Sequence, residues 1–155
     1  MATPNALFLS GAVLTAEQQN NFPFGLVTSQ TLATTFTTTS VTPVDITGLS
    51  VTFTALASRK YLIVAMFNVF PSVVDTGTVF INNGATALAE GFSIPKVGAI
   101  TTTSTITMFT IQTPGAGSVT YKTQAATQAG TSTVYGTSTR ASLAARMFVL
   151  DIGTA

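Results

Sequence analysis

The chain has 155 residues, of which only 7% are charged, and its formal net charge at pH 7 is +1. About a quarter of the residues in an ordinary soluble domain are charged, so a large part of this surface is expected to be covered by other protein. Cysteine and histidine are absent, which excludes a disulfide framework, a thiolate zinc site and a Ser-His-Asp triad. Six basic and five acidic residues without clusters predict no nucleic-acid partner.

Residues 1–23 are expected to form an N-terminal arm, followed by one domain over 24–155. The middle of the arm is apolar, with Phe8, Leu9, Val13 and Leu14. A signal peptide carries Lys or Arg before its apolar region, and no such residue precedes this one. We therefore expect the arm to remain in the mature protein and these four side chains to dock on a partner.

The rest of the chain predicts an all-β domain, because threonine and other β-branched residues recur and no amphipathic helix is found. Asn83-Gly84 predicts a tight type I′ hairpin, and 113–117 (TPGAG) predicts a turn. A change of apolar face near Met108 and Phe109 predicts a bulge. The expected strands are 46–56, 61–70, 77–82, 86–93, 99–112, 118–125, 131–136 and 142–152. Their number and spacing indicate an antiparallel jelly-roll-like β-sandwich.

Residues 61–70 read YLIVAMFNVF, which is too short for a membrane span and is followed by Pro71. We expect no membrane partner. As a strand, this run is apolar on both faces, so one face fills the core and a neighbouring subunit is expected to cover the other. We assign Ile63, Phe67 and Val69 to this subunit interface, with Asn68 fixing its register.

Arg146 alternates onto the same strand face as Phe148, Leu150 and Ile152. A charge there needs a route to solvent or a partner. Either Arg146 reaches water at the strand end, or it pairs across the interface with Glu90 or Asp151. Arg146 and Phe148 therefore join the predicted interface.

Little in the sequence indicates a catalytic, metal-binding or phosphate-binding site. The five carboxylates are widely spaced, and Asp75-Thr76-Gly77 is more typical of a turn than of a calcium site. The glycines of 115–118 lack the strand–loop–helix context of a phosphate site. We expect no catalytic residue, metal or cofactor, and no enzyme.

Taken together, GLSVTFTAL (48–56), SRK (58–60), YLIVAMFNV (61–69), INNG (81–84), PGAGSVTYKTQA (114–125) and SLAARMFVLDI (142–152) resemble small jelly-roll proteins of tailed-bacteriophage virions. The resemblance rests on the order and character of the strands over 46–152, and carries no individual functional residue. Those proteins are often trimeric and are similar in outline to the TNF/C1q-like sandwich.

The resemblance implies a virion structural protein. The first hypothesis is a homotrimeric decoration (cement) protein on the outer surface of the capsid, bridging units of the major capsid protein. The alternative is the receptor-binding head of a tail or head fibre. A shell-forming coat protein is a third possibility, although residues 1–58 contain no Lys or Arg to neutralise a packaged genome.

Overall fold

The structure is a computed structural model, and it describes residues 19, 21–72, 76–93 and 103–155. Almost all regular structure in this part of the chain is β. The elements are β1 (Gly25–Thr31), β2 (Phe36–Thr38), β3 (Val44–Ala55), β4 (Arg59–Pro71), β5 (Gly77–Asn83), β6 (Thr86–Phe92), β7 (Ser104–Gln112), β8 (Gly117–Thr127), β9 (Ser132–Val134), the short helix α2 (Thr137–Arg140), the 3-10 turn η1 (Ala141–Leu143) and β10 (Arg146–Thr154).

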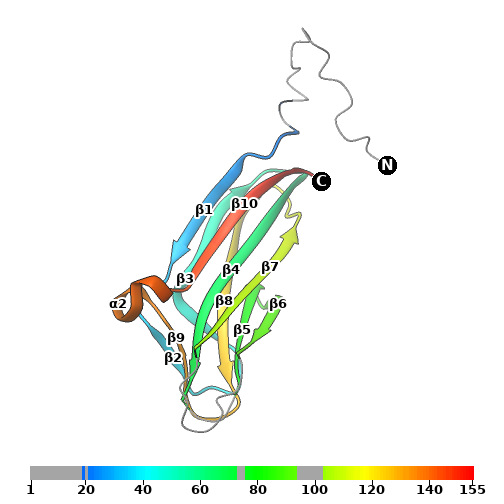
Figure 1. Cartoon of the computed structure of the whole chain (residues 1–155). Coiled ribbons are helices and arrows are strands. Elements are labelled where there is room, and N and C mark those ends of the chain that lie inside the picture. Colours follow the sequence, from blue (N-terminus) through cyan, green and yellow to red (C-terminus); the bar gives the residue numbers. More distant parts are fainter. Residues whose placement is uncertain (1–18, 20, 73–75, 94–102) are drawn as a thin grey trace.

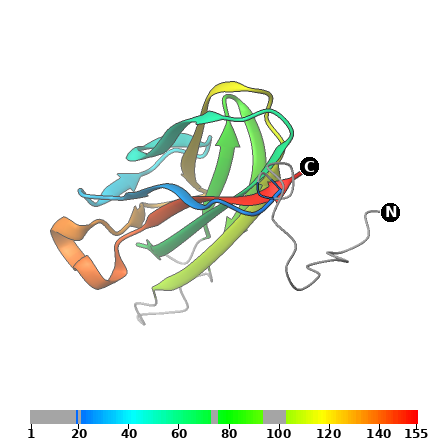
Figure 2. The same ribbon diagram turned by 90° about the horizontal axis from the view of Figure 1, so that it is seen from above.

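The strands form two sheets that face each other (Figure 1). Sheet A contains β1, β10, β4 and β7, and the short strands β9 and β2 extend it beyond the end of β4. Sheet B contains β3, β8, β5 and β6 in that order. Viewed along the strands, the two sheets enclose one interior, and α2 projects to the side (Figure 2).

The strand pairing is that of a jelly roll. Leaving aside the short β2 and β9, the first strand pairs with the last, the second with the seventh, the third with the sixth and the fourth with the fifth. Every pair is antiparallel, as in a long hairpin that has been rolled up. The predicted fold class, an all-β antiparallel jelly-roll-like sandwich, is confirmed.

Alternating residues fill the core between the sheets. β4 contributes Tyr61, Ile63, Ala65, Phe67 and Val69, each at most 2% exposed. Opposite them lie alternate residues of β3, β5 and β8, and the rings of Phe53 and Tyr61 meet with centroids 4.9 Å apart. Side chains of this size each stabilise the fold by roughly 1.5–3 kcal/mol on burial.

Some local predictions need correction. β7 pairs with β4 in an unbroken register, so the bulge predicted near Met108 and Phe109 is wrong. A large irregularity lies instead in β3, where residues 46–49 bulge out between Asp45 and Ser50. The β5–β6 hairpin is confirmed, but its turn is displaced by one residue: Asn83 pairs with Thr86, and the positive φ occurs at Gly84 alone.

The segment between β9 and β10 folds back onto the connection between β1 and β2. The N–H groups of Thr137 and Ser138 donate to the carbonyls of Leu32 and Ala33, at 2.9 and 2.8 Å. Gly136 sits so close to this connection that an added Cβ would lie 2.5 Å from the carbonyl carbon of Thr34. The β1–β2 connection and α2 therefore form one packed unit.

Candidate interaction surface

The outer face of sheet A carries apolar side chains on four adjacent strands. Residues paired across neighbouring antiparallel strands project from the same face, so the register defines rows that cross the sheet. One row is Leu26, Leu150, Leu62 and Ile111, and the next is Ser29, Phe148, Val64 and Phe109. A third row is Thr31, Arg146, Met66 and Thr107. We call the apolar members the apolar face: Leu26, Leu62, Val64, Met66, Phe109, Ile111, Phe148 and Leu150.

The apolar face is open to solvent in the single chain. Phe109 is 68% exposed, Leu26 62%, Ile111 53% and Met66 40%. If a side chain of this kind has roughly 150–200 Å² of surface, these four expose on the order of 400 Å². That area is comparable with the largest apolar patch on a typical monomer, and the four half-buried members of the face add to it.

The outer surface of sheet B is polar where β3 and β8 pair. It presents exposed Ser50, Thr52 and Thr120, and the Thr52 and Thr120 hydroxyls are hydrogen-bonded at 2.7 Å. Beside them, Lys122 Nζ donates to Asp45 Oδ2 at 2.8 Å and Gln124 Nε2 donates to Asp45 Oδ1 at 2.7 Å. These hydrogen bonds lower the pKa of Asp45. The two outer surfaces therefore differ in polarity, as in a protein that buries one of them.

The structure corrects three residues of the predicted subunit interface. Ile63, Phe67 and Val69 are 0% exposed and belong to the core between the two sheets, so their side chains cannot contact another subunit. The assignment of these three to an interface is wrong because both faces of β4 are apolar and the inward face was mistaken for the outward one. The outward residues of β4 are Leu62, Val64, Met66, Asn68 and Phe70, which are half-buried or exposed.

Arg146 and Phe148 do lie on the outer side of sheet A, Arg146 exposed and Phe148 half-buried. Asp151 is not free to pair with Arg146, because its side chain is 1% exposed and is bound to Arg59. Glu90 is exposed on β6, and its pairing with Arg146 of a second subunit stays a prediction.

Asn68 connects three parts of one chain. Its Nδ2 donates to the carbonyl of Leu143 at 2.9 Å, and its Oδ1 accepts a hydrogen bond from Thr105 Oγ1 at 2.6 Å. Asn68 therefore joins β4 to η1 and β7 at one end of the apolar face. A further role in an intersubunit register stays a prediction.

A buried ion pair that the sequence analysis missed lies at the other end of the apolar face. Arg59 Nε donates to Asp151 Oδ2 at 2.8 Å, and Arg59 Nη2 donates to Asp151 Oδ1 and to the carbonyl of Phe22, the latter at 2.8 Å. The guanidinium also lies over the ring of Phe24, 3.9 Å from its centroid. This pair ties residues 22–24, where the chain leaves the arm, to β4 and β10.

Hydrogen bonding decides the protonation of this pair. Burial raises the pKa of Asp151, but hydrogen bonds from Arg59 and from the N–H groups of Gly153 and Phe24 outweigh it, so the pKa lies below its ordinary value of 3.8. The hydrogen bond to Asp151 raises the pKa of Arg59 despite its burial. Both groups are therefore charged at neutral pH. The sequence signal was the Arg of SRK (58–60), which begins β4, and the single Asp within β10, but their partnership depends on the β4–β10 pairing.

The four arm residues Phe8, Leu9, Val13 and Leu14 lie outside the described residues, so their docking role stays a prediction. In the described part of the chain, no group of three or more acidic or other ligating side chains is placed to hold a metal ion. No helix among these residues has the length and apolar character needed to cross a bilayer.

Comparison with protein families found no matching family model, and comparison with curated proteins found no match. Solved structures with a similar chain path include viral capsid proteins. The VP2 subviral particle of infectious bursal disease virus matches 98% of this chain and 43% of its own, with 15% identity and a TM-score of 0.40. The T13 particle of the same virus matches 99% of this chain and 41% of its own, with 13% identity and a TM-score of 0.41. The present chain spans less than half the length of those capsid chains.

Proposed function

We propose that this chain is a virion structural protein that acts as a homotrimer and decorates the outer surface of a capsid. In this proposal, the apolar face closes against neighbouring subunits, and the arm attaches the trimer to the major capsid protein. The observation that carries the proposal is the apolar face itself, which lies on one side of a sandwich whose β3–β8 surface is polar.

A second copy of the chain is the occupant that the composition favours. Homo-oligomer interfaces are more apolar than the rest of a protein surface, and stable ones bury about 800 Å² on each partner. The four exposed members of the apolar face alone supply about half of that area. In the described residues of its four strands, the outward positions include no carboxylate, and their only cations are Lys60 and Arg146, which are too few to form a charge pattern that an acidic or basic partner would recognise. The number three comes from the resemblance to trimeric phage proteins.

The trimer is tested by light scattering on the purified chain and on Phe109→Lys. Phe109 is exposed, so lysine there leaves the core intact but places a charge in the proposed interface. We expect the unaltered chain to have three times its chain mass of 16.0 kDa and Phe109→Lys to be monomeric. Thr120→Lys, an exposed strand position on sheet B, is the matched control and should remain trimeric. A monomeric unaltered chain would refute the proposed interface.

The decoration role is tested separately, through the arm. Phe8, Leu9, Val13 and Leu14 are replaced together by serine, which leaves Phe22 and its bond to Arg59 in place. We expect a trimer that no longer co-sediments with capsids of the virus that encodes it. If the altered trimer still binds capsids, the arm assignment fails. If neither form binds capsids and the trimer is intact, the fibre-head alternative is favoured.

A further inference from the structure

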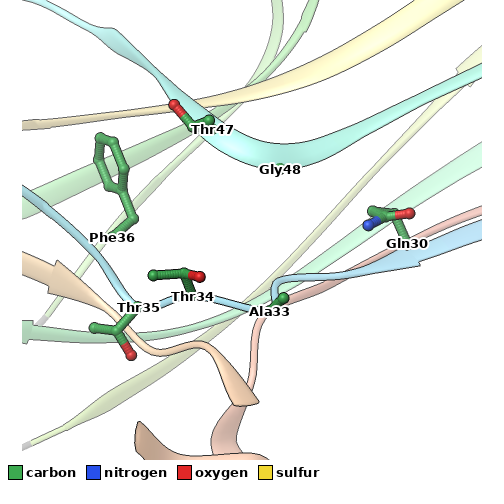
Figure 3. Close-up of a pocket in the computed structure, with 7 residues that line it drawn as sticks. All are labelled: Gln30, Ala33, Thr34, Thr35, Phe36, Thr47 and Gly48. Atoms are coloured by element: carbon green, nitrogen blue, oxygen red, sulfur yellow. The ribbon is translucent and has the colours of Figure 1, made fainter. Parts of the chain in front are cut away.

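A cleft of about 430 Å³ lies between the β1–β2 connection and the bulge of β3 (Figure 3). It is lined by Gln30, Ala33, Thr34 and Phe36 on one side and by Thr47 and Gly48 on the other, with Thr35 in its wall. Its volume lies within the ~300–1,000 Å³ range of small-molecule sites. The cleft is separate from the residues of the apolar face, so the inference drawn from it is independent of the proposed function.

Hydrogen bonds within the chain hold one wall of the cleft in place. The Thr35 side chain points away from the cleft (Figure 3). Its hydroxyl accepts from Gly136 N at 3.0 Å and donates to Thr139 Oγ1 at 2.8 Å. Thr35 N donates to Ser138 Oγ at 3.2 Å. This wall is therefore fastened to the α2 segment before any ligand arrives, which lowers the entropic cost of binding.

The opposite wall is fixed by the core. Ile46 and Leu49, which flank Thr47 and Gly48, are 2% and 0% exposed. Thr123 Oγ1 donates to the carbonyl of Leu49 at 2.9 Å from the neighbouring strand. Gly48 has a φ of +86°, a conformation that glycine adopts without strain. The bulge that opens the cleft is thus anchored on both sides.

The groups left facing the cleft are polar, neutral and available. The hydroxyls of Thr34 and Thr47 make no hydrogen bond within the described part of the chain, and Gln30 makes only a 3.4 Å contact from Nε2 to the next carbonyl. The half-buried ring of Phe36 lies at the end of the cleft opposite Gln30 (Figure 3). None of the described residues that line the cleft has an ionisable side chain.

We propose that this cleft binds a neutral saccharide. Sugar rings present hydroxyls that both donate and accept, and threonine hydroxyls and a glutamine amide match this chemistry without charge. Their C–H faces pack on aromatic rings such as Phe36. A phosphate or carboxylate ligand would call for Arg, Lys or clustered N–H groups, which the cleft lining does not offer.

Saturation-transfer difference NMR on the full chain tests the proposal, with glucose, galactose, mannose and N-acetylglucosamine as probes and N-acetylneuraminic acid as the charged comparison. We expect saturable binding of at least one neutral sugar and weaker binding of the acid. Thr47→Trp fills the cleft and should weaken that binding about tenfold or more. Thr54→Trp, an exposed position on the same strand outside the cleft, should change it less than about twofold.

Thermal melts of both variants establish that they are folded. If no neutral sugar binds, if the acid binds more tightly, or if a folded Thr47→Trp protein binds as well as the unaltered chain, the proposal is overturned.

Discussion

Removing the carboxylate of Asp151 should destabilise the fold strongly. In Asp151→Ala, the Arg59 guanidinium would stay buried, with 5% of its side chain exposed, and would lose its ionic partner. The N–H of Gly153 would also lose an acceptor that is now 3.0 Å away. Removing one partner of a buried pair costs about 3–5 kcal/mol. At ~2–4 °C per kcal/mol for a chain of this size, the melting temperature should fall by about 10 °C.

The assay is denaturant unfolding followed by circular dichroism, because the chain has no tryptophan to report by fluorescence. Protein concentration must be held fixed, since association adds to apparent stability. The double variant Arg59→Met with Asp151→Leu removes both charges at similar volume and should recover most of the loss. A loss below about 1 kcal/mol in Asp151→Ala, or a double variant as unstable as the single one, would refute the reasoning.

The same pair predicts a direction for acid unfolding. The pKa of Asp151 is lower in the folded chain than its ordinary 3.8. Its contribution to stability is therefore complete above the unfolded pKa and is lost as the pH falls from about 4 through the lower folded value. Asp151→Ala should show a smaller change in stability over this pH range than the unaltered chain. Equal pH dependence in the two proteins would contradict the assignment.

Two further predictions concern packing and surface charge. Gly136→Ala places a Cβ 2.5 Å from the backbone of Thr34, so it should cost about 2 kcal/mol or more. The Cβ of Gly115→Ala meets nothing within 4 Å, so this control should cost about 0.5 kcal/mol or less. Equal losses in thermal melts would contradict this. Lys122→Ala removes the ion pair with Asp45 and should lower the free energy of unfolding by less than about 0.5 kcal/mol even at low salt, because the Asp45 side chain is 53% exposed. A loss above about 1 kcal/mol in urea unfolding would be too large for a surface pair and would contradict this.

Alternation in the sequence was sufficient to predict the strands of the core but not their orientation. In 61–70 both faces are apolar, so hydropathy identifies two faces without saying which one points inward. The same ambiguity explains the misplaced bulge: Met108 points inward, and Phe109 and Ile111 point outward onto the apolar face. When only one face of a strand is expected to be apolar, an apolar pattern that passes from one face to the other is interpreted as a bulge. Here both faces of β7 carry apolar residues and the register is unbroken.

The prediction also omitted β1, β2 and α2. Most residues of β1 are exposed, and it contributes little to the core, so its sequence GLVTSQT lacks the alternation of a half-buried strand. Its place in the sheet depends on pairing with β10, which is distant in sequence. The saccharide cleft was equally hidden, because its two walls come from Gln30–Phe36 and Thr47–Gly48 and meet only after folding.

The pairing of β1 with β10 has a consequence for synthesis on the ribosome. Gly25 lies opposite Asp151, so sheet A is incomplete until almost all of the sequence shown has been translated. Until β7 and then β10 emerge, β4 exposes both backbone edges as well as two apolar faces. Long-range pairing of this kind slows folding and leaves nascent chains prone to aggregation. Yield in a host cell should therefore depend more on chaperones that shield unfinished chains than on the stability of the finished sandwich.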